Sequence, residues 1–374
     1  MNSKSSMSHD TSNEEGMRTG LSHGVNLLVC AQTVDIKDPF NGFFVEWLRE
    51  MSSHFSSVHV ISLSAGEYYL PSNVRVLSLG KESVRGPRFV VRFRYIWLLL
   101  QYSWSLRREY DSVFVHQSQE FILSAGFLWA LLRKPVYLWR NHYAGNILTD
   151  IAAYFSRKVF YTSHFSYTAK YKHSVAMPVG VDVEQFAPGG DVERRARSIL
   201  FLGRITPSKR PHMLLEALSI VQKKSISFKA SLYGSYLPSD STYREELIQK
   251  VNTSALKDSV TFHEGIPHKD VPRVFNQFEL YVNLAQSGML DKTIFEAAAC
   301  GAVPLTASKD YADMAGEQFL FENAEDLAKK LEQFLGMPEN KKDELRSRIR
   351  ALVVQKHSLK ELGRLLSVQM VALN

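Results

Sequence analysis

The sequence of 374 residues is poor in cysteine and has no long hydrophobic run. Its two cysteines, Cys30 and Cys300, can build neither a disulfide framework nor a cysteine-based metal site, and they fit a reduced, cytoplasmic compartment. The most apolar stretches, 95–104 and 121–132, are well short of the ~20 residues that a membrane span needs, so we expect core helices there. Residues 1–22 are polar and lack the apolar centre of a signal peptide, so we expect a disordered leader.

Acidic residues are scarce in one long part of the chain. Between Arg75 and Lys172 there are 15 Lys/Arg and five Asp/Glu, whereas the whole chain has a formal net charge of +7. Such a stretch suits nucleic acid, a phosphate-bearing substrate or an anionic membrane surface. Residues 85–108 combine arginines with aromatic residues, which is typical of an interfacial helix, although the apolar half also fits a core helix. Because no nucleic-acid-binding module is visible, we expect no nucleic acid partner.

The length and the pattern of the chain favour two α/β domains. Short apolar runs alternate with helical patterns over the first 180 residues, which indicates βαβ units and a parallel sheet. A break rich in Pro, Gly and charge at 186–198 interrupts this alternation, which then starts again. Two α/β halves of similar size are therefore expected on either side of one linker.

A candidate anion site lies early in the second half. The segment FLGRITPSKRPHMLLEAL places Gly203 at a strand end, Arg204 beside it and Lys209 just before a helix that Pro211 opens. In α/β sheets, a strand end that leads into a helix N-terminus binds anions. Two cations five residues apart on that loop can clamp a diphosphate, although a solvated basic loop fits this fragment equally well.

Two further segments give this site a family context. SGMLDKTIFEAAACG (287–301) is a second turn into a helix, and MPVGVDVEQFAPG (177–189) precedes the linker. In this order and spacing, the three segments resemble the GT-B-fold glycosyltransferases, specifically the retaining family GT4. That family carries PNGVDxxxFxP, then GRLxxxKG, then an E-x7-E motif on a loop that enters a helix ending EAMACGxPV. The resemblance covers approximately residues 25–366.

The resemblance implies a fold and a division of labour. The fold is α/β of the GT-B type, with two Rossmann-like parallel-sheet domains that face a central cleft. Residues 23–190 are expected to bind the acceptor and residues 191–350 the nucleotide sugar, with a C-terminal helix at 351–374 that returns to the first domain.

On the donor side, the resemblance assigns Arg204 and Lys209 to the diphosphate and Glu296 to the ribose. A carboxylate suits the ribose because it accepts hydrogen bonds from two vicinal hydroxyls at once. The segment TFHEGIPHKDV aligns with the loop that faces the base. The expected donor-binding residues are Gly203, Arg204, Lys209, Gly265, Ile266, Asp291, Lys292, Thr293 and Glu296.

The sequence departs from the family at the first Glu of E-x7-E, because position 288 is a glycine. In the family this Glu contacts hydroxyls of the transferred sugar. Asp291 and Lys292 stand nearby instead. Asp291 either caps the helix N-terminus or takes over the sugar contact, and Lys292 adds positive charge near the phosphates. The departure leaves both the donor sugar and turnover open.

On the acceptor side, DPFNGFF lies where the family has a Gly-rich loop, and VYLWRNHYAG ends a strand with three polar residues. The family has a histidine at this second place, which faces the donor sugar. His116 ends the preceding strand and is an alternative, and a structural role fits each of these residues as well. The expected acceptor-binding residues are Asn41, Gly42, His116, Arg140 and Asn141, and the expected catalytic residues are His142, Arg204, Lys209 and Asp291.

The resemblance implies a retaining transfer in which the leaving diphosphate itself accepts the acceptor proton. The chain has no D-x-D motif, so we expect no metal and no cofactor. The expected function is sugar transfer from a nucleotide-diphosphate sugar to a hydroxyl of a glycan or lipid-linked acceptor, in surface polysaccharide or glycoconjugate synthesis. The enzyme is expected in the cytoplasm, at the inner face of an anionic membrane. Two alternatives are a catalytically weakened sugar-nucleotide-binding partner subunit and a nucleotide-sugar 2-epimerase of the same fold.

Overall fold

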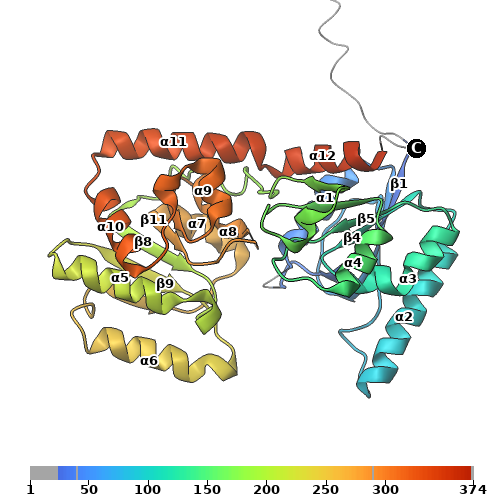
Figure 1. The fold of residues 1–374 in the computed structure, drawn as a ribbon, viewed down its shortest axis with the longest axis horizontal. Helices are drawn as coiled ribbons and strands as arrows, with labels where there is room; N and C mark the ends of the chain where they lie inside the picture. Colours follow the sequence, from blue (N-terminus) through green and yellow to red (C-terminus); the bar gives the residue numbers. More distant parts are fainter. Residues whose placement is uncertain (1–23, 39–40, 289, 372–374) are drawn as a thin grey trace, which may run out of the picture.

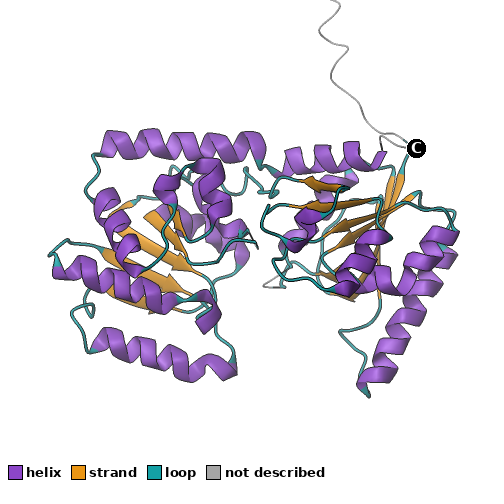
Figure 2. Cartoon of the chain, viewed as in Figure 1, coloured by secondary structure: helices purple, strands orange, loops and turns teal. Residues whose placement is uncertain are grey.

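The computed structural model describes residues 24–38, 41–288 and 290–371. The expected leader at 1–22 lies outside the described residues. Two sheets are present, each flanked by helices (Figures 1 and 2). The prediction of two parallel-sheet α/β domains is therefore confirmed.

The first domain is built on a parallel sheet with the strand order β3-β2-β1-β4-β5-β6-β7. Its elements are β1 (Asn26–Val34), α1 (Phe43–Ser52), β2 (Ser57–Ala65), β3 (Val74–Ser78), α2 (Arg88–Ser105), β4 (Ser112–His116), α3 (Glu120–Leu131), β5 (Val136–Trp139), α4 (Ile147–Tyr154), β6 (Lys158–Tyr161) and β7 (Ser174–Ala176).

Alternation along the strands divides this domain into two cores. Leu27 and Val29 of β1 face one side of the sheet, where they pack with α1 and with the last helix, α12 (Leu359–Val371). Leu28 and Cys30 face the other side, which α2, α3 and α4 cover. Successive side chains of a strand point to opposite faces, so a continuous apolar run such as β1 is buried on both sides.

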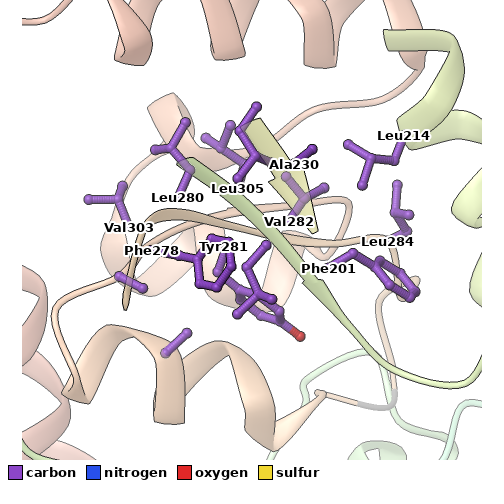
Figure 3. Close-up of a cluster of buried hydrophobic side chains, with 14 of the residues drawn as sticks. Phe201, Leu214, Ala230, Phe278, Leu280, Tyr281, Val282, Leu284, Val303 and Leu305 are labelled. Carbon is purple, nitrogen blue, oxygen red and sulfur yellow. The ribbon is translucent and has the colours of Figure 1, made fainter. Parts of the chain in front are cut away.

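The second domain is built on a parallel sheet with the strand order β10-β9-β8-β11-β12. Its elements are β8 (Arg195–Leu202), α5 (Pro211–Lys223), β9 (Lys229–Tyr233), α6 (Ser241–Asn252), β10 (Val260–His263), α7 (Val271–Gln277), β11 (Phe278–Asn283), α8 (Lys292–Ala299), β12 (Val303–Thr306), α9 (Lys309–Ala315), α10 (Ala324–Leu335) and α11 (Glu339–Lys356). Figure 3 shows its core, in which side chains of β11 and β12 pack with Phe201 of β8 and Leu214 of α5.

The chain crosses between the domains twice, and the two crossings are hydrogen-bonded to each other. Backbone N–H groups of Gly180 and Val181 donate to the carbonyl of His357 at 3.1 and 2.8 Å, and Leu359 N donates to Val181 O at 2.7 Å. Beyond this point α12 lies on the first domain, whereas α11 lies on the second (Figure 1). The chain returns to the first domain at His357 and not at the expected boundary at residue 350. Up to that point it forms α11, which buries Val353 in the core of the second domain.

None of the helices in the described ranges is both long enough and apolar enough to cross a membrane.

Candidate functional site

The candidate site lies where the strand order of the second sheet reverses. From β8 the chain builds β9 and β10 on one side, and it then returns to place β11 and β12 on the other. The loops that leave β8 and β11 therefore diverge, and ligands of open α/β sheets bind in the crevice that such a reversal creates. These loops lead into α5 and α8, so each of them ends at a helix N-terminus.

An ion pair joins the two loops. Lys209, at the end of the β8–α5 loop, places its Nζ 2.9 Å from Oδ2 of Asp291. The other carboxylate oxygen of Asp291 accepts hydrogen bonds from the backbone N of Thr293 at 3.3 Å and from its Oγ1 at 2.8 Å. Asp291 is thus the N-cap of α8. It is also the partner of Lys209, a pairing that the sequence analysis did not anticipate.

The charge of this carboxylate follows from its partners. Burial raises the pKa of Asp291, but the positive charge and hydrogen bond of Lys209, together with the hydrogen bond from Thr293, outweigh burial and hold the pKa below its ordinary value. Thr293 is held in turn by the hydroxyl of Tyr281 on β11, at 2.7 Å. Contacts with Lys209, Asp291 and Tyr281 therefore hold the first turn of α8 in place.

Two further charged residues of α8 lie close to each other. Glu296 is buried, and its Oε1 lies 3.8 Å from Nζ of Lys292 and 3.6 Å from Nε2 of His268. Burial lowers the pKa of Lys292, and the charge of Glu296 opposes this shift. Lys292 also reaches the first domain, where its Nζ lies 4.8 Å from the centre of the Phe43 ring at the start of α1.

The loop after β8 is pressed against the loop after β9. Gly203 N donates to Tyr233 O at 3.0 Å, and a Cβ added to Gly234 would lie 1.9 Å from Gly203 O. Only glycine fits at position 234, and the sequence analysis missed this residue although it follows an apolar run. Arg204 is half-buried on the same loop.

The two residues expected near the base follow β10. Gly265 is exposed, and a Cβ at that position would lie 3.1 Å from Ser235 N in the loop after β9. Ile266 is half-buried and packs against the core of the second domain. The loops after β8, β9 and β10 thus lie in succession along one edge of the sheet.

Arg210 is a second residue that the sequence analysis missed. It directly follows Lys209 and has a left-handed backbone (φ 52°, ψ 37°) at the start of α5. Its guanidinium donates from both Nε and Nη2 to the carbonyl of Leu284, which directly follows β11. Lys209 and Arg210 therefore both connect the β8–α5 loop with the segment that follows β11. The family pattern GRLxxxKG has a glycine at this position. Nothing in the sequence indicated that an arginine there would contact Leu284.

Gly288, where the resemblance expects a glutamate, makes a close approach to the first domain. Its φ is +94°, and its N–H donates to Oδ2 of the buried Asp310 at 2.9 Å. A Cβ added here would lie 2.7 Å from Cβ of Tyr143 and 3.0 Å from the carbonyl oxygen of Phe165. Both the backbone conformation and the neighbouring domain therefore exclude a larger side chain at this position without movement.

The polar residues after β5 hold their own loop together. Asn141 accepts hydrogen bonds from Thr162 N and Ser163 N at 3.2 and 2.9 Å, and Arg140 Nη2 donates to Ala144 O at 3.2 Å. His142 accepts from Ala144 N at 2.9 Å through Nδ1, and its ring stacks on Tyr143 with centroids 4.6 Å apart. Because Tyr143 meets Gly288, the structure brings the His142 loop next to the loop that leads into α8.

His116 is buried at the end of β4, below the start of α1. Its ring stacks on Phe44 with centroids 4.2 Å apart, and the ring of Trp47 lies edge-on at 5.4 Å. Burial lowers the pKa of His116 to about 3, so the ring is neutral near pH 7. The Nε2 atom has no hydrogen-bond partner within the described part of the protein.

The turn that leads into α1 explains the glycine at position 42. Gly42 N donates to Asp38 O at 3.0 Å, and an added Cβ would lie 2.7 Å from the same oxygen. Asn41 N donates to the Asp38 carboxylate at 2.7 Å. The tight turn accounts for both residues as structural elements, so their predicted contact with the acceptor stays a prediction.

The described residues hold no group of three or more His, Cys, Asp or Glu side chains arranged as metal ligands. The expected absence of a metal stays a prediction. A pocket of about 300 Å³ lies beside the domain crossing, and it contains none of the predicted site residues; its lining includes Glu46, Arg49, Asp182, Glu184 and Lys360.

The protein thus has two α/β domains and a candidate site with positive charge where the strand order of the second sheet reverses. Comparison with known proteins relates this architecture to a known class. Residues 186–351 match the profile of the family described as "Glycosyl transferases group 1". The match covers most of the second domain, and the whole chain has the GT-B fold. The predicted resemblance is confirmed for the family and for the fold.

Curated relatives are distant. The chain is 26% identical over 178 residues to the GDP-mannose-dependent alpha-(1-6)-phosphatidylinositol monomannoside mannosyltransferase of Mycolicibacterium smegmatis, covering 43% of this chain and 44% of that protein. It is 23% identical over 225 residues to the D-inositol 3-phosphate glycosyltransferase of Segniliparus rotundus, covering 58% of this chain and 50% of that protein. The chain thus spans about half the length of the curated relatives that it matches.

A solved structure covers more of the chain. The crystal structure of HepE from Anabaena in complex with UDP superposes with a TM-score of 0.75 at 15% identity, covering 93% of this chain and 100% of that protein. Another structure of HepE holds UDP-glucose. At this identity the likeness establishes the fold alone.

Proposed function

We propose that this protein is a retaining glycosyltransferase that moves a sugar from a nucleotide-diphosphate sugar to a hydroxyl of its acceptor. The observation that carries the proposal is the pairing of Lys209 with Asp291, because it places a lysine at the N-terminus of α8 where the sheet order reverses. The family of the second domain and the nucleotides named in the HepE structures support the same function.

The arrangement suits the leaving diphosphate. An ammonium group has three donors, so Lys209 can keep its bond to Asp291 while it donates to a phosphate oxygen. Arg204, on the same loop, can add a guanidinium, and the positive end of the α8 dipole adds to the positive charge there. Fixed positive groups that face the bond to be broken stabilise the charge that grows on the leaving group.

The buried Glu296 is proposed to accept hydrogen bonds from the ribose hydroxyls of the donor. Its Oε1 lies 3.6 Å from Nε2 of His268 and 3.8 Å from Nζ of Lys292, so hydrogen-bond donors surround the carboxylate on two sides. Retention is proposed to follow from proton transfer between the acceptor hydroxyl and the leaving diphosphate on one face of the sugar. No metal is part of this scheme, because Arg204 and Lys209 supply the positive charge.

The acceptor is proposed to be a glycan or lipid-linked molecule, bound by the loops of the first domain around His142. The basic and aromatic segment 85–108 is proposed to touch an anionic membrane at the cytoplasmic face. The membrane proposal rests on the exposed aromatic side chains and arginines of α2.

A sugar-nucleotide-binding partner subunit is the second candidate, and Gly288 is the observation that favours it. Without the first motif glutamate, one expected contact with the transferred sugar is missing. The two candidates differ in one property, since a partner subunit binds the nucleotide sugar but does not turn it over.

The test compares Arg204→Ala and Lys209→Met with Lys223→Met, a matched control at the exposed end of α5. Release of nucleoside diphosphate and calorimetric binding of the donor are measured for each variant, with and without EDTA. We expect both site variants to lose about tenfold or more in donor affinity, because a hydrogen bond to a charged group is worth ~1.5–3 kcal/mol. The control should behave as the wild type, and activity should persist in EDTA. Wild-type donor binding by both site variants would refute the site, and donor binding without turnover would favour the partner subunit.

A further inference from the structure

One lysine of the second domain is held between the two domains. The helix α8 lies on the side of the second domain that faces the first (Figure 1), and Lys292 is its first residue. The Lys292 side chain is only 20% exposed. Its Nζ lies 3.8 Å from Oε1 of Glu296, one turn further along α8, and 4.8 Å from the centre of the Phe43 ring on α1. The ammonium group thus meets a carboxylate of its own domain and an aromatic ring of the other.

The ring that receives the ammonium group has a defined position. Phe43 is half-buried at the start of α1, where its ring lies edge-on to Trp47 with centroids 5.8 Å apart and to His116 with centroids 6.1 Å apart. On the other side, Glu296 is buried within the second domain. Lys292 therefore connects two groups that are each held by the packing of a different domain.

The charges around Lys292 also come from both domains. Burial lowers the pKa of Lys292, and the negative charges of Glu296 on α8, of Glu46 on α1 and of Asp182 beside the domain crossing oppose this shift. An ammonium group that leaves water needs such partners, because its burial is otherwise costly. The surroundings that suit the buried ammonium group thus depend on the first domain being in place.

The segment that leads into α8 touches the first domain at a second point. Gly288 makes its close approach to Tyr143 and Phe165 four residues before Lys292 meets Phe43. In the family pattern, position 288 carries a glutamate that contacts the transferred sugar. In this chain the same segment instead makes two contacts between the domains.

We propose that Lys292 is a positioning residue that couples the donor site to the first domain, by holding Glu296 on one side and the ring of Phe43 on the other. The inference rests on the proposed function, in which Glu296 binds the ribose. Because one ammonium group meets both partners, the carboxylate is oriented for the ribose when Phe43 is in place. Coupling of this kind is reciprocal, so donor binding at Glu296 in turn stabilises the contact between the domains.

The test measures calorimetric binding of UDP-glucose, GDP-mannose and ADP-glucose to the full chain and its variants. Phe43→Leu should weaken binding by about three- to tenfold although Phe43 belongs to the first domain, because a desolvated contact between a cation and a ring is lost. Lys292→Met should weaken it further, and the double variant should bind no more weakly than Lys292→Met, since the contact is already absent there. Lys292→Arg keeps the charge and the ring contact and should stay within about twofold of the wild type. The control Phe127→Leu, at an exposed position of α3, should bind as the wild type does.

A second measurement separates coupling from a local role of Lys292. In small-angle X-ray scattering without donor, Phe43→Leu and Lys292→Met should each have a larger radius of gyration than the wild type. An unchanged radius, additive losses of affinity in the double variant, or wild-type affinity of Phe43→Leu would each refute the coupling while leaving the proposed function intact. Phe43→Leu alone decides the question if Lys292→Met does not fold. A wild type that binds none of the three nucleotide sugars would refute the proposed function, and the coupling with it.

Discussion

Lys209 and Asp291 are 82 residues apart in the chain, yet their side chains form an ion pair with Nζ 2.9 Å from Oδ2. The pair ties the loop after β8 to the first turn of α8, and it also explains why an acid and a lysine stand side by side at positions 291 and 292. Asp291 turns back to cap its own helix and to hold Lys209, whereas Lys292 points toward Glu296 and Phe43. The ion pair with Lys209 is thus a third role of Asp291, beside the helix cap and the predicted sugar contact.

The first prediction separates the cap from the ion pair. Asn caps a helix about as well as Asp but carries no charge, so Asp291→Asn should lower the free energy of unfolding by about 1 kcal/mol through the lost pair. Asp291→Ala should lower it by about 1 kcal/mol more, because the cap is lost as well. Urea unfolding at pH 7 measures both changes. Equal stability of Asp291→Asn and the wild type would mean that the ion pair contributes nothing.

The second prediction concerns Arg210, whose left-handed backbone is unfavourable for a residue with a side chain. Arg210→Gly removes two hydrogen bonds to Leu284 but relieves the strain, so its unfolding free energy should stay within about 1 kcal/mol of the wild type. Arg210→Ala loses the bonds and keeps the strain, which costs ~1–2 kcal/mol, and should be clearly less stable than Arg210→Gly. Thermal unfolding of the two variants is the measurement. An alanine variant as stable as the glycine variant would show that the backbone is not strained.

The sequence predicted the fold and selected candidate residues for the donor site. The alternation of short apolar runs with helical patterns was enough to predict two parallel-sheet domains, because such runs are buried on both faces. Arg204, Lys209 and Glu296 could be selected because each stands in a segment with a family pattern. The pairing of Lys209 with Asp291 could not, because it depends on β8 and β11 being neighbours, which the order of strands in the chain does not reveal.

The roles of two other residues also depend on contacts between segments that the sequence does not reveal. Gly234 matters because the loop after β8 passes within contact of its Cα, which is a property of two loops and not of one segment. His116 stood at a strand end like a functional residue, but Phe44 and Trp47 of α1 enclose it. Its predicted acceptor contact stays a prediction.

The third prediction uses the burial of His116. Its pKa in the folded protein is lowered to about 3, below the ordinary value of 6.5, so the unfolded chain binds a proton on acidification before the folded chain does. This contribution to stability is present above pH 6.5 and is lost as the pH falls toward 3. His116→Phe should retain about 1.5 kcal/mol more of its stability than the wild type between pH 6.5 and pH 5. Urea unfolding across this range is the test, and parallel pH profiles for the two proteins would contradict it.

The fourth prediction concerns the glycine that replaces the motif glutamate. Restoring the acid with Gly288→Glu should not raise sugar transfer, because any Cβ at φ +94° meets Tyr143 and Phe165. Gly288→Ala is the matched control, and both variants should lose ~1–2 kcal/mol of stability and some donor turnover. Transfer rates of the two variants are compared with the wild type. A glutamate variant that is faster than the wild type would mean that the chain lacks only the missing carboxylate.

The most direct test of the account is thermal unfolding of the wild type and of Arg204→Ala with Lys209→Met, each titrated with UDP-, GDP- and ADP-sugars. A ligand at 100 times its Kd stabilises the folded state by about 2.7 kcal/mol, which is a clear rise in Tm. The account predicts that at least one nucleotide sugar stabilises the wild type and the Lys223→Met control, and that the double variant loses this response. No response of the wild type to any of the three donor classes, or an equal response of the double variant, would contradict the claim that the β8–α5 loop and α8 form the donor site.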